Sequence, residues 1–377
     1  MRIAVNTRFL VKDRLEGMGR FTMEVLRRMV RNHPEHEFFF LFDRPYHEDF
    51  IFSKNVKPII VSPPARHPIL FYIWYEWSIP TILKNIKADV FLSMDNFCSI
   101  KTKVPTLLVI HDLAYLHFPD QISKTNLMFY RHFTPKYIAR ADRIIAVSSF
   151  TKEDIIQEFS TPSEKIEVAC NGCSTNFRPL NPESTDYIRR EVTDGKPYFI
   201  YVGAIHPRKN VGRMIAAFSQ FKASTQSDVK MVIIGRKAWM TKAAKDAFKD
   251  SKFKEDIIFK GFVAREKLPV YIGASLALLY VSLFEGFGIP ILEAMHTEVP
   301  VITSNVSSMP EVAGEAAILV DPYDVGAIAK AMESIYKNED LRTELIRKGR
   351  QQRQKFTWNK AADVVYSNLL KAASFQP

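Results

Sequence analysis

Short apolar runs alternate with helix-length segments along almost the whole chain, in two successive series. Strands buried on both faces of a parallel sheet are apolar throughout, and the helices that cover such a sheet lie between them in sequence. The alternation therefore predicts an α/β protein with two doubly wound parallel sheets. The predicted strands are Ile3–Asn6, Glu37–Phe42, Ile59–Ser62, Val90–Ser93, Thr106–Ile110, Ile144–Ser148 and Ile166–Ala169, then Tyr198–Val202, Lys230–Ile234, Ile257–Lys260, Leu276–Val281, Val299–Thr303 and Ala317–Val320; predicted helices include Phe21–Val30, Phe71–Leu83 and Leu127–Arg140.

The length of the chain supports two domains. Its 377 residues exceed the ~250–300 at which a single core usually stops growing. The polar segment Arg178–Lys196, with two prolines and a glycine, is interpreted as the connection between them. We predict Rossmann-like domains over 1–180 and 190–356, with the last helix, about Asn359–Leu370, able to pack on either. Ligands of such folds bind at the carboxyl ends of the strands, so a cleft between the domains is the expected site.

Charge and composition exclude several classes of protein. The net charge of +11 is spread over both halves without a concentrated basic stretch, which argues against a dedicated nucleic-acid reader. It suits anionic small ligands and an anionic membrane surface better. No apolar run is long enough to span a bilayer, the start of the chain has no signal-peptide layout, and three cysteines do not suggest a disulfide framework. We therefore expect the cytosol.

The most informative motif is Ser282–Met295, which follows an apolar strand. Glu285 precedes a helix predicted to begin at Pro290, and Glu293 falls within that helix. Carboxylates accept hydrogen bonds from sugar hydroxyls, and the backbone amides of Gly286–Gly288 can donate to ligand oxygens. The alternative is a structural strand-to-helix turn in which Glu293 complements the helix dipole.

A second motif is the basic turn His206–Asn210, which follows the strand Tyr198–Val202. Arg208 and Lys209 precede a helix for which Asn210 is the predicted N-cap. A guanidinium, an ammonium group and unpaired helix amides together suit a diphosphate. The alternative is a solvated basic turn.

These motifs and four others, in this order, resemble glycosyltransferase family 4, the retaining group 1 glycosyltransferases with the GT-B fold. The motifs are Gly17-Met18-Gly19-Arg20 before the first helix, His111-Asp112 after a central strand, Asn171-Gly172, Pro207–Asn210, Glu285 with Glu293, and Phe356-Thr357-Trp358. The resemblance covers nearly the whole chain. It implies that the segment 357–377 crosses back to the first domain.

The resemblance also implies roles for individual residues. Arg208 and Lys209 would hold the donor diphosphate, and Glu293 would bind the ribose hydroxyls. The remaining donor contacts would come from Gly19, from Val263 near the base, and from Glu285, Gly286, Phe287 and Gly288 around the sugar. His111 would lie beside the anomeric centre.

The predicted chemistry is sugar transfer from a nucleotide-sugar, which is a substrate and not a cofactor. The transition state carries positive charge on the sugar ring and negative charge on the leaving phosphate. Arg208 and Lys209 can stabilise that phosphate without a metal, and no paired-aspartate motif is present. Retention is implied by the family; we favour front-face attack, because no second carboxylate has an obvious nucleophile's place.

Three features keep structural alternatives open. His111 could simply be a strand-end histidine bonded to Asp112. Cys170 and Cys173 have metal-like spacing but lack the four ligands that zinc normally takes, so they are expected to flank a turn. The aromatic run Phe71–Pro80 favours a packed helix, with a membrane or acceptor surface as the alternative.

The predicted function is a glycosyltransferase that transfers a hexose, predicted to be mannose from GDP-mannose, to a saccharide or lipid-linked acceptor in polysaccharide or glycolipid synthesis. We expect peripheral contact with the inner face of the cytoplasmic membrane, and no nucleic-acid partner. The alternative is a nucleotide-sugar-binding protein without transfer activity. A dinucleotide-dependent dehydrogenase is disfavoured, because no G-x-G-x-x-G follows the first strand.

Overall fold

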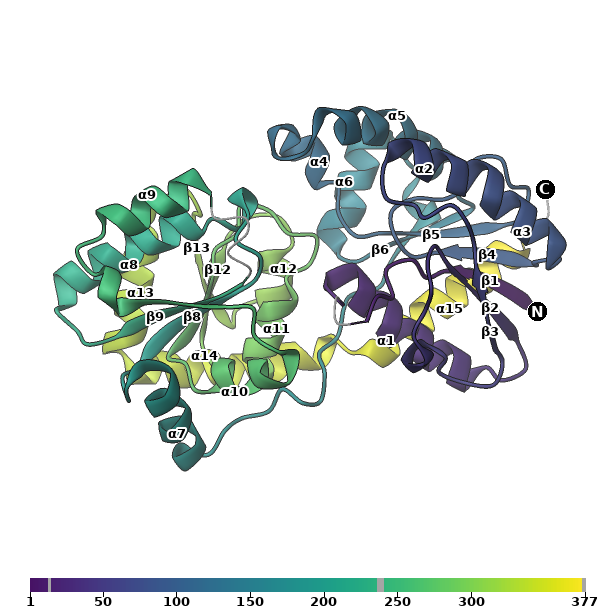
Figure 1. Ribbon diagram of the computed structural model, residues 1–377. Helices are drawn as coiled ribbons and strands as arrows, with labels where there is room; N and C mark the ends of the chain where they lie inside the picture. Colours follow the sequence, from purple (N-terminus) through teal and green to yellow (C-terminus); the bar gives the residue numbers. More distant parts are fainter. Residues whose placement is uncertain (13–14, 236–240, 375–377) are drawn as a thin grey trace. The chain divides into compact units, whose positions relative to one another are not determined.

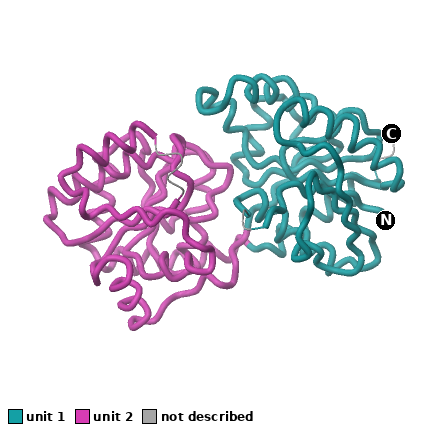
Figure 2. The backbone as a smooth tube through the Cα atoms, in the orientation of Figure 1, with its two compact units in different colours: residues 1–171, 357–377 teal, residues 172–356 magenta. Residues whose placement is uncertain are grey.

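The computed structural model describes residues 1–12, 15–235 and 241–374, and the chain forms two compact units (Figure 2). Unit 1 consists of Met1–Asn171 and Thr357–Pro377, and unit 2 of Gly172–Phe356. The carboxy-terminal helix α15 (Trp358–Ser374) therefore packs in unit 1, against α1 (Gly17–Asn32) and the strands of its sheet. No helix of the described residues is both long and apolar enough to cross a membrane.

Unit 1 is a seven-stranded parallel sheet with helices on both faces (Figure 1). Its strands are β1 (Arg2–Asn6), β2 (Glu37–Phe42), β3 (Val56–Ile60), β4 (Val90–Ser93), β5 (Thr106–Ile110), β6 (Arg143–Ala146) and β7 (Ile166–Val168), in the order β3-β2-β1-β4-β5-β6-β7. The other helices are α2 (Pro68–Ile73), α3 (Ile79–Asn85), α4 (Ala114–His117), α5 (Lys124–Arg140) and α6 (Ser149–Phe159). Helices α1 and α15 lie on one face, while α2 and α5 share a hydrophobic core with the other.

Unit 2 is a six-stranded parallel sheet in the order β10-β9-β8-β11-β12-β13. Its strands are β8 (Tyr198–Val202), β9 (Lys230–Ile234), β10 (Ile257–Gly261), β11 (Ala277–Tyr280), β12 (Val301–Ser304) and β13 (Ala317–Val320). Its helices are α7 (Pro182–Thr193), α8 (Val211–Thr225), α9 (Lys242–Asp250), α10 (Leu268–Gly273), α11 (Ile289–His296), α12 (Met309–Ala313), α13 (Val325–Lys337) and α14 (Glu339–Gln352). In both sheets the strand order reverses once, between β1 and β4 and between β8 and β11, which is where such folds bind ligands.

The predicted fold class is confirmed, and each predicted strand has a counterpart. The largest shift is at β3, which was predicted at Ile59–Ser62 and runs over Val56–Ile60. This strand lies at the edge of the sheet, where Lys57 and Pro58 are tolerated because an edge strand needs fewer ladder hydrogen bonds. The charged and proline residues had made the first half of the strand look like a loop.

The interpretation of Arg178–Lys196 as a connection was wrong for most of its length. Helix α7 fills Pro182–Thr193 and belongs to unit 2. Asn181 caps it by accepting from the backbone N–H of Ser184, and Pro182 occupies its first turn. The proline and glycine that had suggested a linker therefore mark the start and end of a helix.

The aromatic run lies mostly in the core. The predicted helix Phe71–Leu83 consists of α2, a π-helical turn at Trp74–Ser78, and α3. Pro80 explains the turn, because it lacks an N–H and its ring would clash with the carbonyl four residues earlier in a regular helix. Trp74 and Tyr75 are fully buried.

A buried ion pair holds the carboxyl ends of β1 and β4 together. The guanidinium of Arg8 donates to Asp95, and both side chains are nearly inaccessible. The hydroxyl of Tyr75 donates to the same carboxylate over 2.8 Å. The rings of Phe71 and Phe97 lie 4.9 and 5.4 Å from the Arg8 guanidinium carbon. This network ties the strand ends to the aromatic core.

We expect Asp95→Ala to destabilise the protein by about 3–5 kcal/mol, because the buried charge of Arg8 would lose its partner. The matched control is Asp228→Ala, which breaks the exposed pair with Lys196 and should cost less than ~1 kcal/mol. Thermal and denaturant unfolding of both variants measure the difference. Equal effects of the two substitutions would contradict the role of the buried pair.

Candidate functional site

The carboxyl ends of β8 and β11 bring the two predicted motifs of unit 2 together. Arg208 and Lys209 lie in a short 3-10 turn after β8, and Glu285 lies in the loop after β11. The two segments are joined by a backbone hydrogen bond of 2.8 Å from Leu283 N to Arg208 O. The Arg208 guanidinium donates to the carbonyl oxygen of Phe284 over 3.2 Å. Residues 76 apart in sequence thus form one cluster.

The centre of this cluster is an ion pair between Lys209 and Glu285. The Lys209 ammonium lies 2.6 Å from both carboxylate oxygens of Glu285, and the hydroxyl of Tyr280 donates to one of them over 2.7 Å. Burial disfavours the charged form of Glu285, but the charges of Lys209 and Arg208 outweigh burial and lower its pKa below the ordinary value. The site therefore holds an ionised carboxylate beside two cations at neutral pH.

The loop that carries Glu285 is held from a third strand. Ser307 and Ser308 follow β12, the neighbour of β11. The hydroxyl of Ser307 accepts from the N–H of Glu285 over 3.1 Å. The hydroxyl of Ser308 lies 2.8 Å from the carbonyl oxygen of Glu285 and 2.9 Å from that of Phe287. Neither serine was singled out from the sequence, because nothing in their local pattern reveals a contact with a loop more than 20 residues away.

The loop enters α11 through Gly288, whose φ of +104° is a conformation that side chains rarely adopt. Gly286 and Phe287 lie in the same buried loop. The helix begins at Ile289, one residue before the predicted start.

Asn210 lies at the N-cap position of α8, as predicted, but its side chain makes no capping hydrogen bond. Its backbone is left-handed, with φ of 61°. The amide nitrogen instead donates to the carbonyl oxygens of Val281 and Pro322, over 3.0 and 2.7 Å. Asn210 therefore fastens the basic turn to the segments that follow β11 and β13.

Glu293 lies on α11 and is buried. Its carboxylate accepts from the guanidinium of Arg265 over 3.1 Å, and Arg265 stacks at 5.6 Å on the ring of Phe177. Arg265 closely follows Val263, which is half-buried in the segment after β10. Glu293 lies beyond the first turn of α11, so its partner is the guanidinium of Arg265 and not the helix start. Arg265 is a residue of this region that the sequence analysis missed.

In unit 1 the side chain of His111 is buried at the end of β5. Burial lowers its pKa, so the ring is neutral at pH 7. Nε2 lies 2.9 Å from the carbonyl oxygen of Met94 and must carry the proton, which leaves Nδ1 as the acceptor. The backbone N–H of His111 donates to Asn96 over 2.6 Å. The ring is thus fixed in one tautomer and orientation.

Gly19 has a structural reason to be a glycine. The motif Gly17–Arg20 is not a loop, because it forms the first turn of α1. A Cβ at Gly19 would lie 2.6 Å from the carbonyl oxygen of Phe9, so the helix passes the segment after β1 too closely for any side chain.

Within residues 1–12, 15–235 and 241–374, no three histidine, cysteine, aspartate or glutamate side chains are grouped to hold a metal ion. Cys98 is a buried free thiol, and Cys170 and Cys173 are half-buried.

Two family models together match most of the chain. Residues 15–177 match the model described as Glycosyltransferase Family 4, and residues 184–352 match the model described as Glycosyl transferases group 1. The resemblance to glycosyltransferases is therefore confirmed for both halves of the chain.

Individual relatives and solved structures agree with these models. The O-antigen chain mannosyltransferase B of Escherichia coli is 26% identical over 92% of this chain and 94% of its own length. The O-antigen chain mannosyltransferase RfbU of Salmonella typhimurium is 25% identical over 78% of this chain and 80% of its own length. The structure of WaaG, a glycosyltransferase involved in lipopolysaccharide biosynthesis, superposes with a TM-score of 0.76 at 15% identity, covering 97% and 99% of the two chains. The structure of Anabaena Alr3699/HepE in complex with UDP-glucose superposes with a TM-score of 0.75 at 15% identity, covering 98% of this chain and 100% of that one.

The ion pair between Lys209 and Glu285 predicts that the stability difference between the wild type and a variant without Lys209 depends on pH. Because the folded pKa of Glu285 is lowered, its pairing stabilises the protein above the ordinary carboxyl pKa and is lost as the pH falls through the lowered value. We expect Lys209→Met to cost about 3 kcal/mol at pH 7, and this deficit to shrink on acidification below about pH 4.

Melting temperatures across this pH range measure the effect. Lys196→Met, which removes an exposed partner of Asp228, is the control and should stay close to the wild type. A Lys209→Met deficit that is the same at every pH would show that the charge of Glu285 is not involved.

Proposed function

The chain belongs to the glycosyltransferases that combine a family 4 amino-terminal domain with a group 1 carboxy-terminal domain, and from this premise we propose that it transfers mannose from GDP-mannose to a saccharide or lipid-linked acceptor with retention of configuration. Two O-antigen mannosyltransferases among its relatives support mannose and a polysaccharide product. The observation that carries the proposal is the cluster of Arg208, Lys209 and Glu285 at the strand-order reversal of unit 2.

The cluster supplies the charges that sugar transfer needs. The leaving nucleoside diphosphate gains negative charge as the glycosidic bond breaks, and Arg208 and Lys209 stabilise that charge more in the transition state than in the bound donor. Glu285 is ionised by the same two cations, so it can accept hydrogen bonds from the sugar and lie close to the positive charge on its ring. We propose that these two cations make the reaction independent of a metal.

The remaining donor contacts follow from the same loop and helix. The amides at Gly286–Gly288 are proposed to hold oxygens of the sugar and phosphate, Glu293 the ribose hydroxyls, and Val263 the base. Arg265 would then orient the carboxylate of Glu293. The alternative, a protein that binds nucleotide-sugars without transferring the sugar, would use the same contacts. Measured turnover of the donor distinguishes the enzyme from such a binding protein.

A thermal-shift panel of GDP-, UDP- and ADP-sugars tests the donor. We expect GDP-mannose to raise the melting temperature, since a ligand at 100 times its Kd stabilises by about 2.7 kcal/mol. Glu293→Ala should lose most of this response. Glu298→Ala, which removes another glutamate of unit 2 paired with an arginine, should keep it. No shift with any nucleotide at millimolar concentration, or a normal shift in Glu293→Ala, would overturn the assignment.

We propose that His111 acts on the donor sugar. Its Nε2 is committed to Met94, so Nδ1 is the atom that would accept a hydrogen bond from a sugar hydroxyl. His111→Ala should lower kcat at least ~10-fold while the GDP-mannose thermal shift is retained. Full turnover of this variant would remove His111 from the site.

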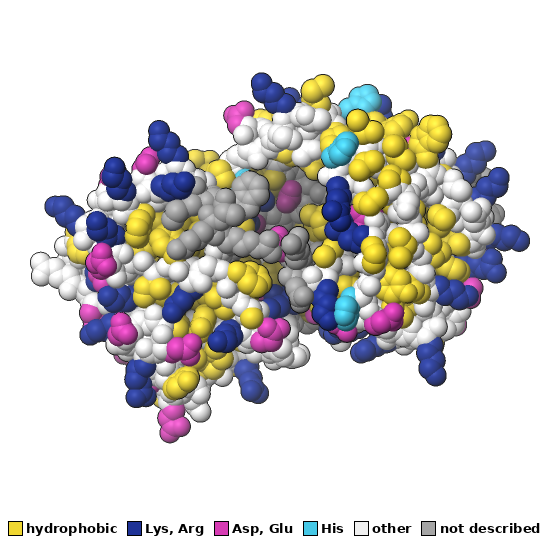
Figure 3. All heavy atoms as spheres, viewed as in Figure 1, with side chains coloured by type: hydrophobic (Ala, Val, Ile, Leu, Met, Phe, Trp, Pro, Cys, Tyr) yellow, Lys and Arg dark blue, Asp and Glu magenta, His cyan; other side chains and the backbone are white. Residues whose placement is uncertain are grey.

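A row of exposed apolar side chains supports peripheral contact with an anionic membrane. Ile69, Ile73 and Trp77 are spaced by four along α2 and the π-helical turn, and are 67%, 36% and 62% exposed. The Lys101 ammonium lies 4.9 Å from the Trp77 ring. Apolar side chains gather on this face of unit 1, with lysine and arginine along its rim (Figure 3). Such a combination favours an anionic lipid surface.

Co-sedimentation with vesicles of phosphatidylglycerol and of phosphatidylcholine tests this contact. We expect binding to the anionic vesicles that weakens with salt and is reduced at least ~10-fold in the double variant Ile73→Ser, Trp77→Ser. Tyr323→Ser, at an exposed position of unit 2, is the control. Absence of binding at low salt, or equal binding by the double variant, would exclude this surface.

A further inference from the structure

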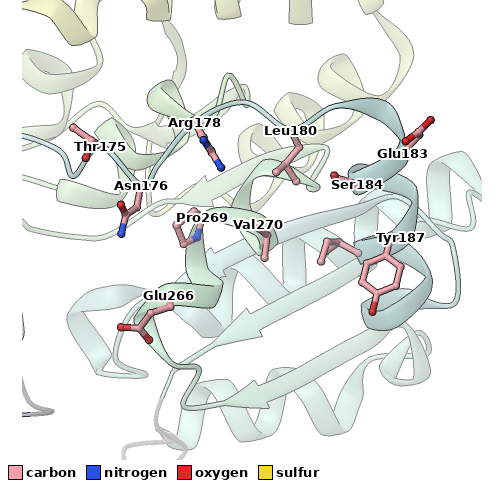
Figure 4. A pocket seen from close by; sticks show the side chains of 11 residues that line it. Thr175, Asn176, Arg178, Leu180, Glu183, Ser184, Tyr187, Glu266, Pro269 and Val270 are labelled. Atoms are coloured by element: carbon pink, nitrogen blue, oxygen red, sulfur yellow. The ribbon is translucent and has the colours of Figure 1, made fainter.

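A groove in unit 2 lies outside the proposed donor contacts. It has a volume of about 720 Å³ and is formed between the segment 175–188 and the start of α10. This volume falls within the ~300–1,000 Å³ of typical ligand pockets. The groove runs from Asn176 and Glu266 at one end to Tyr187 at the other, with Pro269 and Val270 between them (Figure 4).

The lining combines an apolar floor with polar margins. Leu180, Ile188, Pro269 and Val270 supply aliphatic surface, while hydroxyl, amide and charged groups stand around them. The ring of Tyr187 is 64% exposed at the end of the groove. A ligand with both apolar C–H faces and many hydroxyl groups matches this lining, because aromatic and aliphatic side chains pack on such faces while planar polar groups bond the hydroxyls.

The charges of the groove favour a neutral ligand over an anionic one. Its charged side chains are one arginine, Arg178, and two glutamates, Glu183 and Glu266. Phosphate or anionic lipid recognition would require an excess of cations. The guanidinium of Arg178 forms no ion pair with any residue that the structure describes, and in Figure 4 it points into the groove. Its donors are therefore available to hydroxyl oxygens.

We propose that this groove binds a stretch of the acceptor's saccharide chain, away from the residue that receives the new sugar. The inference rests on the proposed function and adds a second substrate-binding site to it. Packing connects the groove to the donor contacts. Phe177 follows the groove residue Asn176 and stacks on Arg265, which in turn holds Glu293. A saccharide chain in the groove would therefore lie next to Phe177 and Arg265, the residues that support the carboxylate of Glu293.

Kinetics with acceptors of different length test the groove. We expect Tyr187→Ala and Arg178→Gln each to raise KM for a long linear oligomannoside about tenfold, while KM for a mannose disaccharide, KM for GDP-mannose and kcat stay unchanged. Tyr323→Ala, which removes another exposed tyrosine of unit 2, is the matched control. Because Tyr187 is exposed, its replacement is not expected to affect folding.

The outcomes separate the two proposals. If the wild type transfers mannose to neither acceptor, the proposed function fails. If it transfers to both and the two groove variants behave like the wild type at every acceptor length, the groove is not a saccharide site. Equilibrium titration of the oligomannoside in the absence of donor gives a second measure, and equal affinity of Tyr187→Ala and wild type would also overturn the inference.

Discussion

The ion pair between Lys209 and Glu285 is the interaction on which the proposed site depends. Glu285 depends on a cationic partner, because a buried carboxylate without a cation would be protonated or destabilising. The pair exists because β8 and β11 are neighbours in a parallel sheet, so that the segments following them meet at one edge. Asn210, Tyr280 and Ser308 then fasten the two segments in place.

Both units place a buried ion pair at the same topological position. In unit 1, Arg8 follows β1 and Asp95 follows β4; in unit 2, Lys209 follows β8 and Glu285 follows β11. Each pair spans the point where the strand order reverses. The surroundings differ, since the first pair is enclosed by aromatic rings and the second retains some exposure of Lys209. The enclosed pair of Arg8 and Asp95 stabilises the fold of unit 1, whereas the more accessible pair of Lys209 and Glu285 is suited to binding a ligand.

Sequence analysis predicted the two sheets because buried parallel strands leave an unmistakable apolar pattern. It failed where one residue type serves two purposes: Pro182 and Gly195 delimit a helix although they resembled a linker, and the side chain of Asn210 fastens a turn although it was expected to cap a helix. It also could not find Ser308 or Arg265, whose contacts join segments distant in sequence. Arg208, Lys209, Glu285 and Glu293 were predicted from the sequence, whereas the residues that hold them in place needed the structure.

The most direct test of the account is transfer of labelled mannose from GDP-mannose to an oligomannoside in the presence of a metal chelator. We predict full turnover of the wild type under these conditions and a loss of at least ~100-fold in kcat for Arg208→Ala, because one of the two cations that stabilise the leaving phosphate would be missing. Turnover that the chelator abolishes and a divalent cation restores would contradict it, as would an Arg208→Ala variant with wild-type activity.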